Sequence, residues 1–210
     1  MVIGIQESLF ADPTATETGV RSLTSGMSRT VLPYGAWVDV RPGWLTGASS
    51  LFDRLSAVVP WRTEQVTMYD SVVDVPRLMR YYDADERLPD PLLEDLRDAL
   101  SVRYRETLPE GFRTAGLCLY RDGDDSVAWH GDRIGRGEHS DTLVAIVSLG
   151  APRVLALRPR GGGQSIRFTL GSGDLLVMGG SCQRTWDHAV PKMRAAGPRI
   201  SIQFRPAGVR

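Results

Sequence analysis

The chain is poor in cysteine and has no long hydrophobic run. Its 210 residues include only two cysteines, Cys118 and Cys182, which form no CxxC motif, so we expect neither a disulfide framework nor a cysteine-based zinc site. No apolar stretch reaches the roughly 20 residues that a membrane-spanning helix needs. The N-terminus also lacks the basic region and apolar stretch of a secretion signal. These absences predict a cytoplasmic protein with no membrane partner.

Lysine is almost missing as well, since 24 of the 25 basic residues are arginine. The formal net charge is zero, yet residues 151–210 carry ten basic and two acidic residues, a net charge of +8 that leaves −8 on the rest. Such asymmetry is found in proteins with a surface for anionic ligands and also in proteins with a solvated basic face. The charge pattern alone leaves both open.

The length suits one domain with a substantial core. Residues 1–28 are rich in threonine, serine, glycine and alanine and predict a loosely ordered lead-in. We expect residues 29–210 to form a single domain. Within it, residues 29–45 predict short edge strands, because β-formers there are interrupted by proline and glycine, and residues 61–89 predict strands and loops.

Two segments before residue 110 have helical periodicity. Residues 47–59 place apolar side chains at helical spacing, with Ser49 or Ser50 as the expected N-cap. Residues 90–107 give the clearer pattern, with Asp90 as cap and a proline in the first turn. The sequence thus predicts two helices ahead of the remaining elements.

After residue 114 the chain changes to short β-rich segments separated by glycines. The expected strands are 115–120, 126–130, 142–149, 153–158, 164–170, 174–178, 183–190 and 198–205. Because the helices precede the strands and do not alternate with them, a doubly wound parallel sheet is excluded. Many short strands with turn signals predict a mainly β fold with flanking helices, and a double-sheet jelly roll fits best.

Three residues of this β-rich half predict a metal centre. His130 and Asp132 are two residues apart, so on an extended strand they share one face. His188 is one of only three histidines and falls in a later strand. Two imidazoles and one carboxylate form the facial triad of non-heme Fe(II) oxygenases. We interpret His139 as a loop residue, and Asp187 as pointing away from the site.

The last predicted strand, RISIQFR, alternates between polar and apolar residues. Arg199, Ser201, Gln203 and Arg205 share one face, and the apolar residues share the other. Buried guanidinium groups need anionic partners, so a polar face turned inward predicts a dicarboxylate co-substrate. The alternative is an edge strand whose arginines lie in water.

The ordered stretches LYRDGDDSVAWHGD, VSLG, GDLLVMGG, RTWDHAVPK and RISIQFR resemble the AlkB family of Fe(II)/2-oxoglutarate dioxygenases. The resemblance covers residues 115–206 and, more faintly, 29–90. It implies a double-stranded β-helix (jelly-roll) core in residues 111–206. Residues 29–110 would supply an N-terminal nucleotide-recognition lid and its supporting helices.

The resemblance also assigns roles to single residues. His130, Asp132 and His188 match the iron ligands, and Arg199 matches the arginine that pairs with the distal carboxylate of 2-oxoglutarate. The further co-substrate contacts that it implies are Arg205 and Tyr120. The implied cofactors are Fe(II), 2-oxoglutarate and O2.

The implied reaction is oxidative dealkylation of damaged bases in DNA, with alkylated DNA as the partner and no protein partner. Arg77 and Tyr82 are the expected lid contacts to the nucleic acid, with Tyr81 and Trp61 as weaker candidates that equally suit packing. A base oxidised at a metal must leave its stack, and aromatic side chains can then stack on it.

The chain departs from the family pattern at three places. Cys118 stands where the family usually has asparagine, Ser201 replaces the asparagine of Arg-x-Asn-x-x-x-Arg, and residues 133–135 lack the acidic residue found in several DNA-repair members. These changes leave alternatives open: the same chemistry on RNA, protein or a small molecule, or a non-catalytic jelly-roll binding protein.

Overall fold

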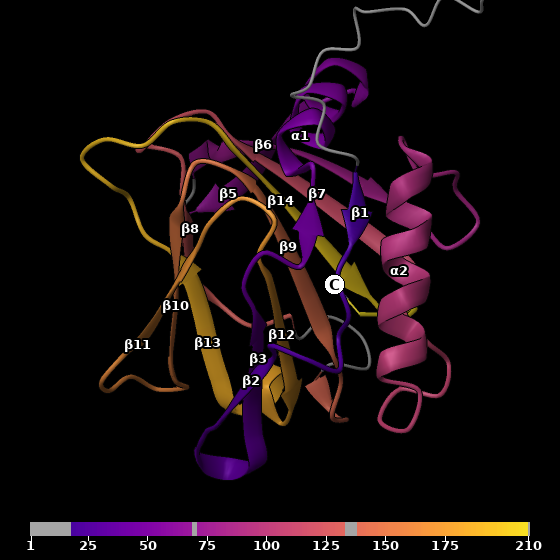
Figure 1. Ribbon diagram of the computed structural model, residues 1–210. Helices are drawn as coiled ribbons and strands as arrows, with labels where there is room; N and C mark the ends of the chain where they lie inside the picture. Colours follow the sequence, from indigo (N-terminus) through magenta and orange to yellow (C-terminus); the bar gives the residue numbers. More distant parts are fainter. Residues whose placement is uncertain (1–17, 69–70, 133–137, 210) are drawn as a thin grey trace, which may run out of the picture.

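The computed structural model describes residues 18–68, 71–132 and 138–209 of the chain (Figure 1). Two antiparallel sheets face each other, and the two longer helices cover the outer side of the larger sheet. This is the mainly β jelly roll with flanking helices that the sequence predicts. None of the helices in the described ranges is long and apolar enough to cross a membrane.

The larger sheet joins strands from both halves of the chain. Its eight strands, in spatial order, are β2 (Ser28–Val31), β3 (Ala36–Arg41), β12 (Leu175–Gly180), β9 (Val144–Gly150), β14 (Arg199–Arg205), β7 (Thr114–Tyr120), β6 (Ser71–Tyr82) and β5 (Arg62–Met68). All neighbouring pairs are antiparallel. The last strand therefore lies at the centre of the sheet, which rules out the exposed edge strand considered from the sequence.

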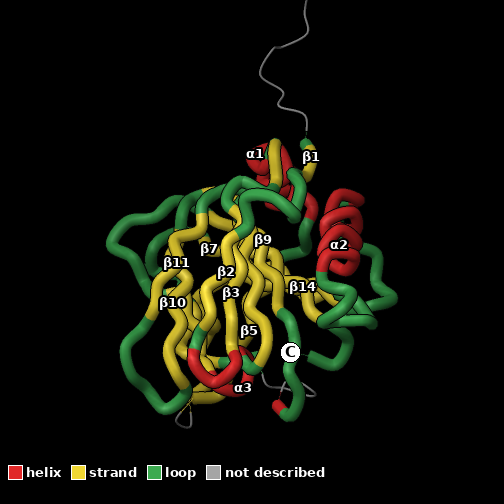
Figure 2. Tube along the Cα trace, turned by 60° about the horizontal axis from the view of Figure 1, so that its bottom comes forward, coloured by secondary structure: helices red, strands yellow, loops and turns green. Residues whose placement is uncertain are grey.

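The smaller sheet forms the opposite wall of the jelly roll (Figure 2). Its four strands, in spatial order, are β11 (Ile166–Leu170), β10 (Arg153–Pro159), β13 (Trp186–Val190) and β8 (Val127–His130). The triple glycine at 161–163 lies in the connection between β10 and β11, where all three residues have positive φ. It is thus a hairpin connection.

Several predicted boundaries shift. Residues 1–17 of the predicted lead-in lie outside the described residues, but β1 (Gly19–Val20) pairs with β4 (Leu45–Thr46) and is not loose. The strand expected over 183–190 is preceded by a short helix, α3 (Cys182–Thr185). In the segment 29–45, only β2 is an edge strand, and β3 pairs on both sides.

The two predicted helices are present as α1 (Ala48–Val58) and α2 (Pro91–Arg103). The predicted cap of α1 is wrong, because its N-cap is Gly47 at φ 65°, a left-handed conformation that glycine adopts without strain. The cap of α2 is confirmed, since the Asp90 side chain accepts a hydrogen bond from the Leu92 amide at 3.0 Å.

The hydrophobic core has two parts, one on each side of the larger sheet. Between sheet and helices lie Leu93, Leu96 and Leu100 of α2, packed in one cluster with the apolar face of β14. Burying each leucine contributes roughly 1.5–3 kcal/mol. The second cluster lies between the sheets. Because β14 turns its apolar residues toward the helices, its polar face points into the jelly roll.

Candidate metal centre and active site

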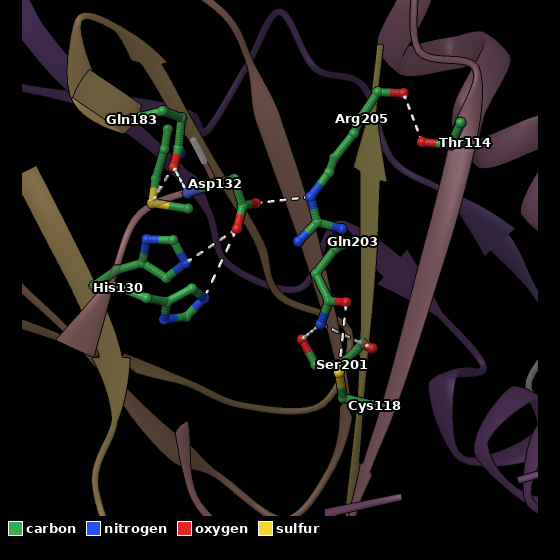
Figure 3. A network of polar contacts seen from close by, with 10 residues as sticks. Thr114, Cys118, His130, Asp132, Gln183, Ser201, Gln203 and Arg205 are labelled. Carbon is green, nitrogen blue, oxygen red and sulfur yellow. Dashed lines mark hydrogen bonds and ion pairs between the residues drawn. The ribbon is translucent and has the colours of Figure 1, made fainter. Parts of the chain in front are cut away.

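The three predicted metal ligands meet between the sheets. His130 ends β8, and it is the direct cross-strand partner of His188 on β13, with ring centroids 4.2 Å apart. Asp132 follows β8 by two residues, and its Oδ1 lies 3.7 Å from His130 Nε2 and 3.9 Å from His188 Nε2. One donor atom from each residue falls within a 4.8 Å group (Figure 3).

This donor set fits a divalent metal ion. Metal–ligand bonds of about 2.0–2.2 Å hold neighbouring ligand atoms about 3 Å apart, so the Asp132 oxygen, at 3.7 and 3.9 Å from the two imidazole nitrogens, needs to approach each by less than about 1 Å. His130 Nδ1 lies 2.9 Å from the Ala128 carbonyl. Since a carbonyl only accepts, Nδ1 carries the proton and Nε2 is left for the metal. Two imidazoles and a carboxylate on one face leave the remaining positions open.

Neighbouring groups keep Asp132 charged and fixed. Its backbone amide donates to Gln183 Oε1 at 3.0 Å, and Arg205 Nε donates to its Oδ2 at 2.7 Å. Burial raises the pKa of Asp132, but Arg205 and then the two imidazoles outweigh it, so the pKa lies well below its usual range. The carboxylate is therefore an anion ready to bind a cation.

A cavity of about 440 Å³ opens beside the triad. On its wall, Arg199 is fully buried, and its Nε donates to Ser148 Oγ at 2.9 Å. Its Nη1 is buried with no hydrogen-bond partner among the described residues. Burial lowers the pKa of Arg199 from its ordinary value. A buried cation with a free donor is a site for a carboxylate.

Tyr120 completes this anion-binding wall. Its ring lies 5.1 Å from the Arg199 guanidinium carbon and 5.4 Å from that of Arg153. Burial raises the pKa of Tyr120 to about 12, so its phenol stays protonated and can donate. Arg153 differs from Arg199 because its guanidinium already donates to three backbone carbonyls, those of Asp122, Asp125 and Pro191.

Comparison with known proteins agrees with this geometry. Residues 42–205 match the 2OG-Fe(II) oxygenase superfamily. The human alpha-ketoglutarate-dependent dioxygenase alkB homolog 3 is 30% identical over 201 residues, covering 86% of this chain and 67% of its own. The chain belongs to the AlkB family of Fe(II)/2-oxoglutarate-dependent dioxygenases. Its cofactors are accordingly Fe(II), 2-oxoglutarate and O2.

A further curated relative and one solved structure are also similar to this chain. The DNA oxidative demethylase ALKBH2 of Arabidopsis thaliana is 31% identical over 140 residues, covering 55% of this chain and 43% of its own. Among solved structures, OsALKBH1 matches with a TM-score of 0.61 at 14% identity, covering 85% of this chain and 100% of its own. The likeness to OsALKBH1 bears on the fold alone.

Two of the three departures from the AlkB motifs lie opposite each other at the floor of the cavity. Cys118 and Ser201 are cross-strand partners on β7 and β14, and Gln203 lies beside them. The Gln203 amide donates to Ser201 Oγ at 2.6 Å, while its Oε1 lies 3.7 Å from Cys118 Sγ (Figure 3). The Cys118 thiol and the Gln203 amide therefore have acceptors within this group, while the Ser201 hydroxyl accepts and keeps its own hydrogen as a donor.

The expected lid contacts divide between cavity and core. Arg77 and Tyr81, both on β6, line the cavity. Tyr82 does not, because it is 4% exposed and belongs to the core beneath the helices. Trp61 also packs against that core. Tyr82 is thus buried in the core and does not line the cavity, whereas Tyr81, the preceding residue on the same strand, does.

Among the described residues, the others singled out in the sequence do not belong to the group of metal-ligand atoms. His139 is exposed, and its Nε2 lies 3.6 Å from a carboxylate oxygen of Glu138. Asp187 is the cross-strand partner of Arg158 and lies on the face of β13 opposite to His188. Burial raises the pKa of Cys182 to about 12, so its thiol stays neutral. Residues 133–135 lie outside the described residues.

Three residues of the site were missed from the sequence alone. Ser148 positions Arg199, and the VSLG stretch that contains it is part of the family resemblance, so a signal existed. Gln183 holds the Asp132 backbone, but the sequence predicted a strand where α3 occurs. Glu64 lines the cavity from β5, and nothing in the sequence pattern marks it.

Proposed function

We propose that this AlkB-family dioxygenase oxidatively dealkylates damaged bases in DNA. The observation that carries the proposal is one cavity with two sites: a His–Asp–His cluster and, beside it, the buried Arg199 guanidinium with an unpartnered donor. Among the described residues the anion site lacks a protein carboxylate, so it suits an oxoacid co-substrate. The similarity to a protein named DNA oxidative demethylase supports DNA as the substrate.

The residues have distinct roles in this proposal. His130, Asp132 and His188 hold the iron. Arg199 pairs with the distal carboxylate of 2-oxoglutarate, and the Tyr120 hydroxyl donates to the same co-substrate. Arg205, which already bonds Asp132, keeps that carboxylate oriented and adds positive charge near the other end of the co-substrate.

Iron, 2-oxoglutarate and O2 together supply the oxidising power that inserts one oxygen atom into a C–H bond of the alkyl group, while 2-oxoglutarate becomes succinate and CO2. The hydroxylated alkyl group then leaves the base nitrogen as an aldehyde. The protein's part is to orient the reactants and to exclude water. Val144, Ile146 and Leu155 give the inner cavity apolar walls that serve this purpose.

The entrance is framed by β6 and β8, and the start of β8 is tied to β6. The Ser126 amide donates to the Pro76 carbonyl at 2.8 Å, and Arg77 Nη1 donates to the Ser126 carbonyl at 3.3 Å. We propose that a base enters here after it leaves the stack, which costs less for a damaged base that pairs poorly. Tyr81 is placed to contact it.

We also propose a narrower lid than the sequence indicates. The β5–β6 hairpin borders the cavity and suits a nucleotide-recognition lid. By contrast, β3 lies inside the larger sheet, and the two long helices pack against the hydrophobic core. We therefore do not assign these elements to the lid. The chain is then one catalytic domain. Both cysteines are free and buried, which supports our proposal of a reducing, cytoplasmic setting.

A product analysis tests the function. The purified protein is incubated with Fe(II), 2-oxoglutarate and a panel of DNA and RNA oligomers that carry methyl or etheno adducts, and the oligomer masses are read. We expect loss of the adduct mass from DNA, coupled to succinate release, and no loss with His188→Ala. Succinate release that no DNA oligomer stimulates would contradict the proposal. Stimulation by RNA oligomers alone would show that the substrate is RNA and not DNA.

A further inference from the structure

An exposed tryptophan lies directly beside the metal ligands, outside the cavity. Trp129 precedes His130 on β8, the edge strand of the smaller sheet. The pairing of β8 with β13 shifts register between Val127 and His130. Trp129 is not among the residues that line the cavity, whereas His130 is, so the two side chains lie on opposite faces of the sheet. Its side chain is 36% exposed, which is uncommon for so large an apolar group.

One face of this ring is covered by an arginine. The guanidinium carbon of Arg158, on β10, lies 4.2 Å from the Trp129 ring centroid. It reaches the ring across β13, where Ala156 and Ala189 are cross-strand partners with small side chains. The Arg158 Nε is buried without a hydrogen-bond partner among the described residues. The pair therefore forms a flat platform, and Asp187 is the cross-strand partner of Arg158 on the same face.

The platform adjoins the entrance of the active site. Val127 and His130 of β8 line the cavity, and Arg77 and Tyr81 of β6 face them. The His130 side chain is 41% exposed, so the cavity opens to solvent along β8. Trp129 is the next residue, one Cα–Cα step of about 3.8 Å away. A polynucleotide with one base in the cavity must pass close to this strand.

The chemistry of the platform matches a nucleotide better than a protein or lipid partner. Bases stack on aromatic rings and on guanidinium planes, and arginines also contact phosphates. An exposed arginine, Arg167 on β11, is the cross-strand partner of Ala156 and so lies on the same outer face as the half-buried Arg158. A solvent-exposed tryptophan with cationic neighbours complements a ligand that is both aromatic and anionic.

We propose that Trp129 and Arg158 bind a nucleotide flanking the one in the cavity, with the base stacked on the indole and the phosphate near the guanidinium. This inference rests on the proposed function and extends it, because it places a second contact site outside the active-site cavity. It predicts that affinity depends on nucleotides next to the damaged one. A lone damaged nucleotide gains nothing from the platform.

The test compares substrates of two lengths. One is a single-stranded DNA of about ten nucleotides with one methylated base, within the span of single-strand binding sites, and the other is the same methylated base as a mononucleotide. We expect Trp129→Ala to raise KM for the oligomer about 5-fold or more, the lower end of the stacking contribution. The kcat for both substrates and the KM for the mononucleotide stay as in the wild type.

Two variants separate stacking from other effects. Trp129→Phe retains an aromatic face, so its KM for the oligomer should lie close to the wild-type value. Arg167→Ala removes a cation from the same sheet face and should raise that KM less than Trp129→Ala does. If Trp129→Ala raises KM equally for both substrates, the residue acts through His130 and the inference is wrong. An unchanged oligomer KM would also overturn it.

A binding measurement that needs no turnover distinguishes this inference from the proposed function. The unmodified oligomer is titrated into wild-type protein, and quenching of tryptophan fluorescence is recorded together with the anisotropy of a dye on the DNA. We expect quenching in the wild type and much less in Trp129→Phe. Binding without any loss of quenching in that variant refutes the platform, while absence of DNA binding by the wild type refutes the proposed function itself. Arg158→Ala gives a second test should Trp129→Ala fail to fold.

Discussion

Replacing Arg199 by methionine should abolish tight 2-oxoglutarate binding without harming the fold. The guanidinium is fully buried in the jelly roll, with one side-chain bond to Ser148 and an unpartnered Nη1. A buried charge without a full set of partners costs free energy, and replacing it by an apolar side chain of similar volume is often neutral or stabilising. We therefore expect Arg199→Met, without co-substrate, to be as stable as the wild type or more stable.

The magnitude of the binding loss follows from the same burial. Removing one partner of a desolvated, hydrogen-bonded charge pair typically costs about 2–5 kcal/mol. Since about 1.4 kcal/mol is tenfold in an equilibrium constant, Kd for 2-oxoglutarate should rise at least about 30-fold. Affinity for DNA should change little, because Arg199 is enclosed at the inner wall of the cavity.

The assay is thermal unfolding with Mn(II) in place of Fe(II), as a function of 2-oxoglutarate concentration. A ligand that binds only the native state raises Tm in proportion to the logarithm of its concentration over Kd. We expect a clear Tm rise in the wild type and almost none in Arg199→Met over the same range. Equal losses of 2-oxoglutarate and DNA affinity would contradict the role given to Arg199.

Arg153 provides a matched control. It is as buried as Arg199 and lies on the same tyrosine ring, but its guanidinium is bonded to backbone carbonyls of three other residues. Arg153→Met leaves those carbonyls without donors and should lower the stability by about 1–3 kcal/mol or more. If the two variants behaved alike, burial and hydrogen-bond satisfaction would not be the quantities that separate the two arginines.

Four other changes test the site and the fold. His188→Ala should eliminate both iron retention, measured by metal analysis, and adduct removal; retained turnover would contradict the ligand assignment. Asp132 has a pKa below its unfolded value, so its contribution to stability is complete above about pH 4 and disappears as the pH falls further; acid unfolding of metal-free Asp132→Asn should depend less on pH in that range. Asp90→Ala removes the α2 cap and should cost about 1 kcal/mol in denaturant unfolding; no change would deny the capping role. A methyl group at Gly179 would lie 2.1 Å from the Trp37 ring, so Gly179→Ala should cost about 1–3 kcal/mol, and an unaltered midpoint would refute that close contact.

The strand-based predictions succeeded where alternation was unambiguous. In RISIQFR, side chains of opposite character alternate without a break, so one face had to be polar and the other apolar. The structure places Ile200, Ile202 and Phe204 under the helices and turns Arg199 toward the cavity. The two histidine ligands could also be predicted, because the chain has only three histidines. The structure places their strands side by side in one sheet.

The sequence could not identify which single residues of the lid face the cavity. In β6 the sequence RYY offers two tyrosines, and a shift of one residue sends either of them to the opposite face. The choice is made by pairing with β7, where Tyr81 lies opposite Gly116 and Tyr82 opposite Ala115. Such pairing joins residues about 35 positions apart in the chain, and local patterns do not contain it.

Because of the departures from the family motifs, we expect Arg199 to contribute a larger share of the free energy of 2-oxoglutarate binding. At the cavity floor the Cys118 thiol donates to Gln203 Oε1, and the Gln203 amide donates to the carbonyl and hydroxyl oxygens of Ser201. Of these three side chains, only the Ser201 hydroxyl therefore keeps a hydrogen for a carboxylate. Arg199 Nη1 is by contrast an unused donor at full burial. Since unsatisfied buried donors gain most from an incoming anion, the free energy of 2-oxoglutarate binding should be concentrated on this residue. Substitution of Gln203 should accordingly alter 2-oxoglutarate affinity far less than substitution of Arg199.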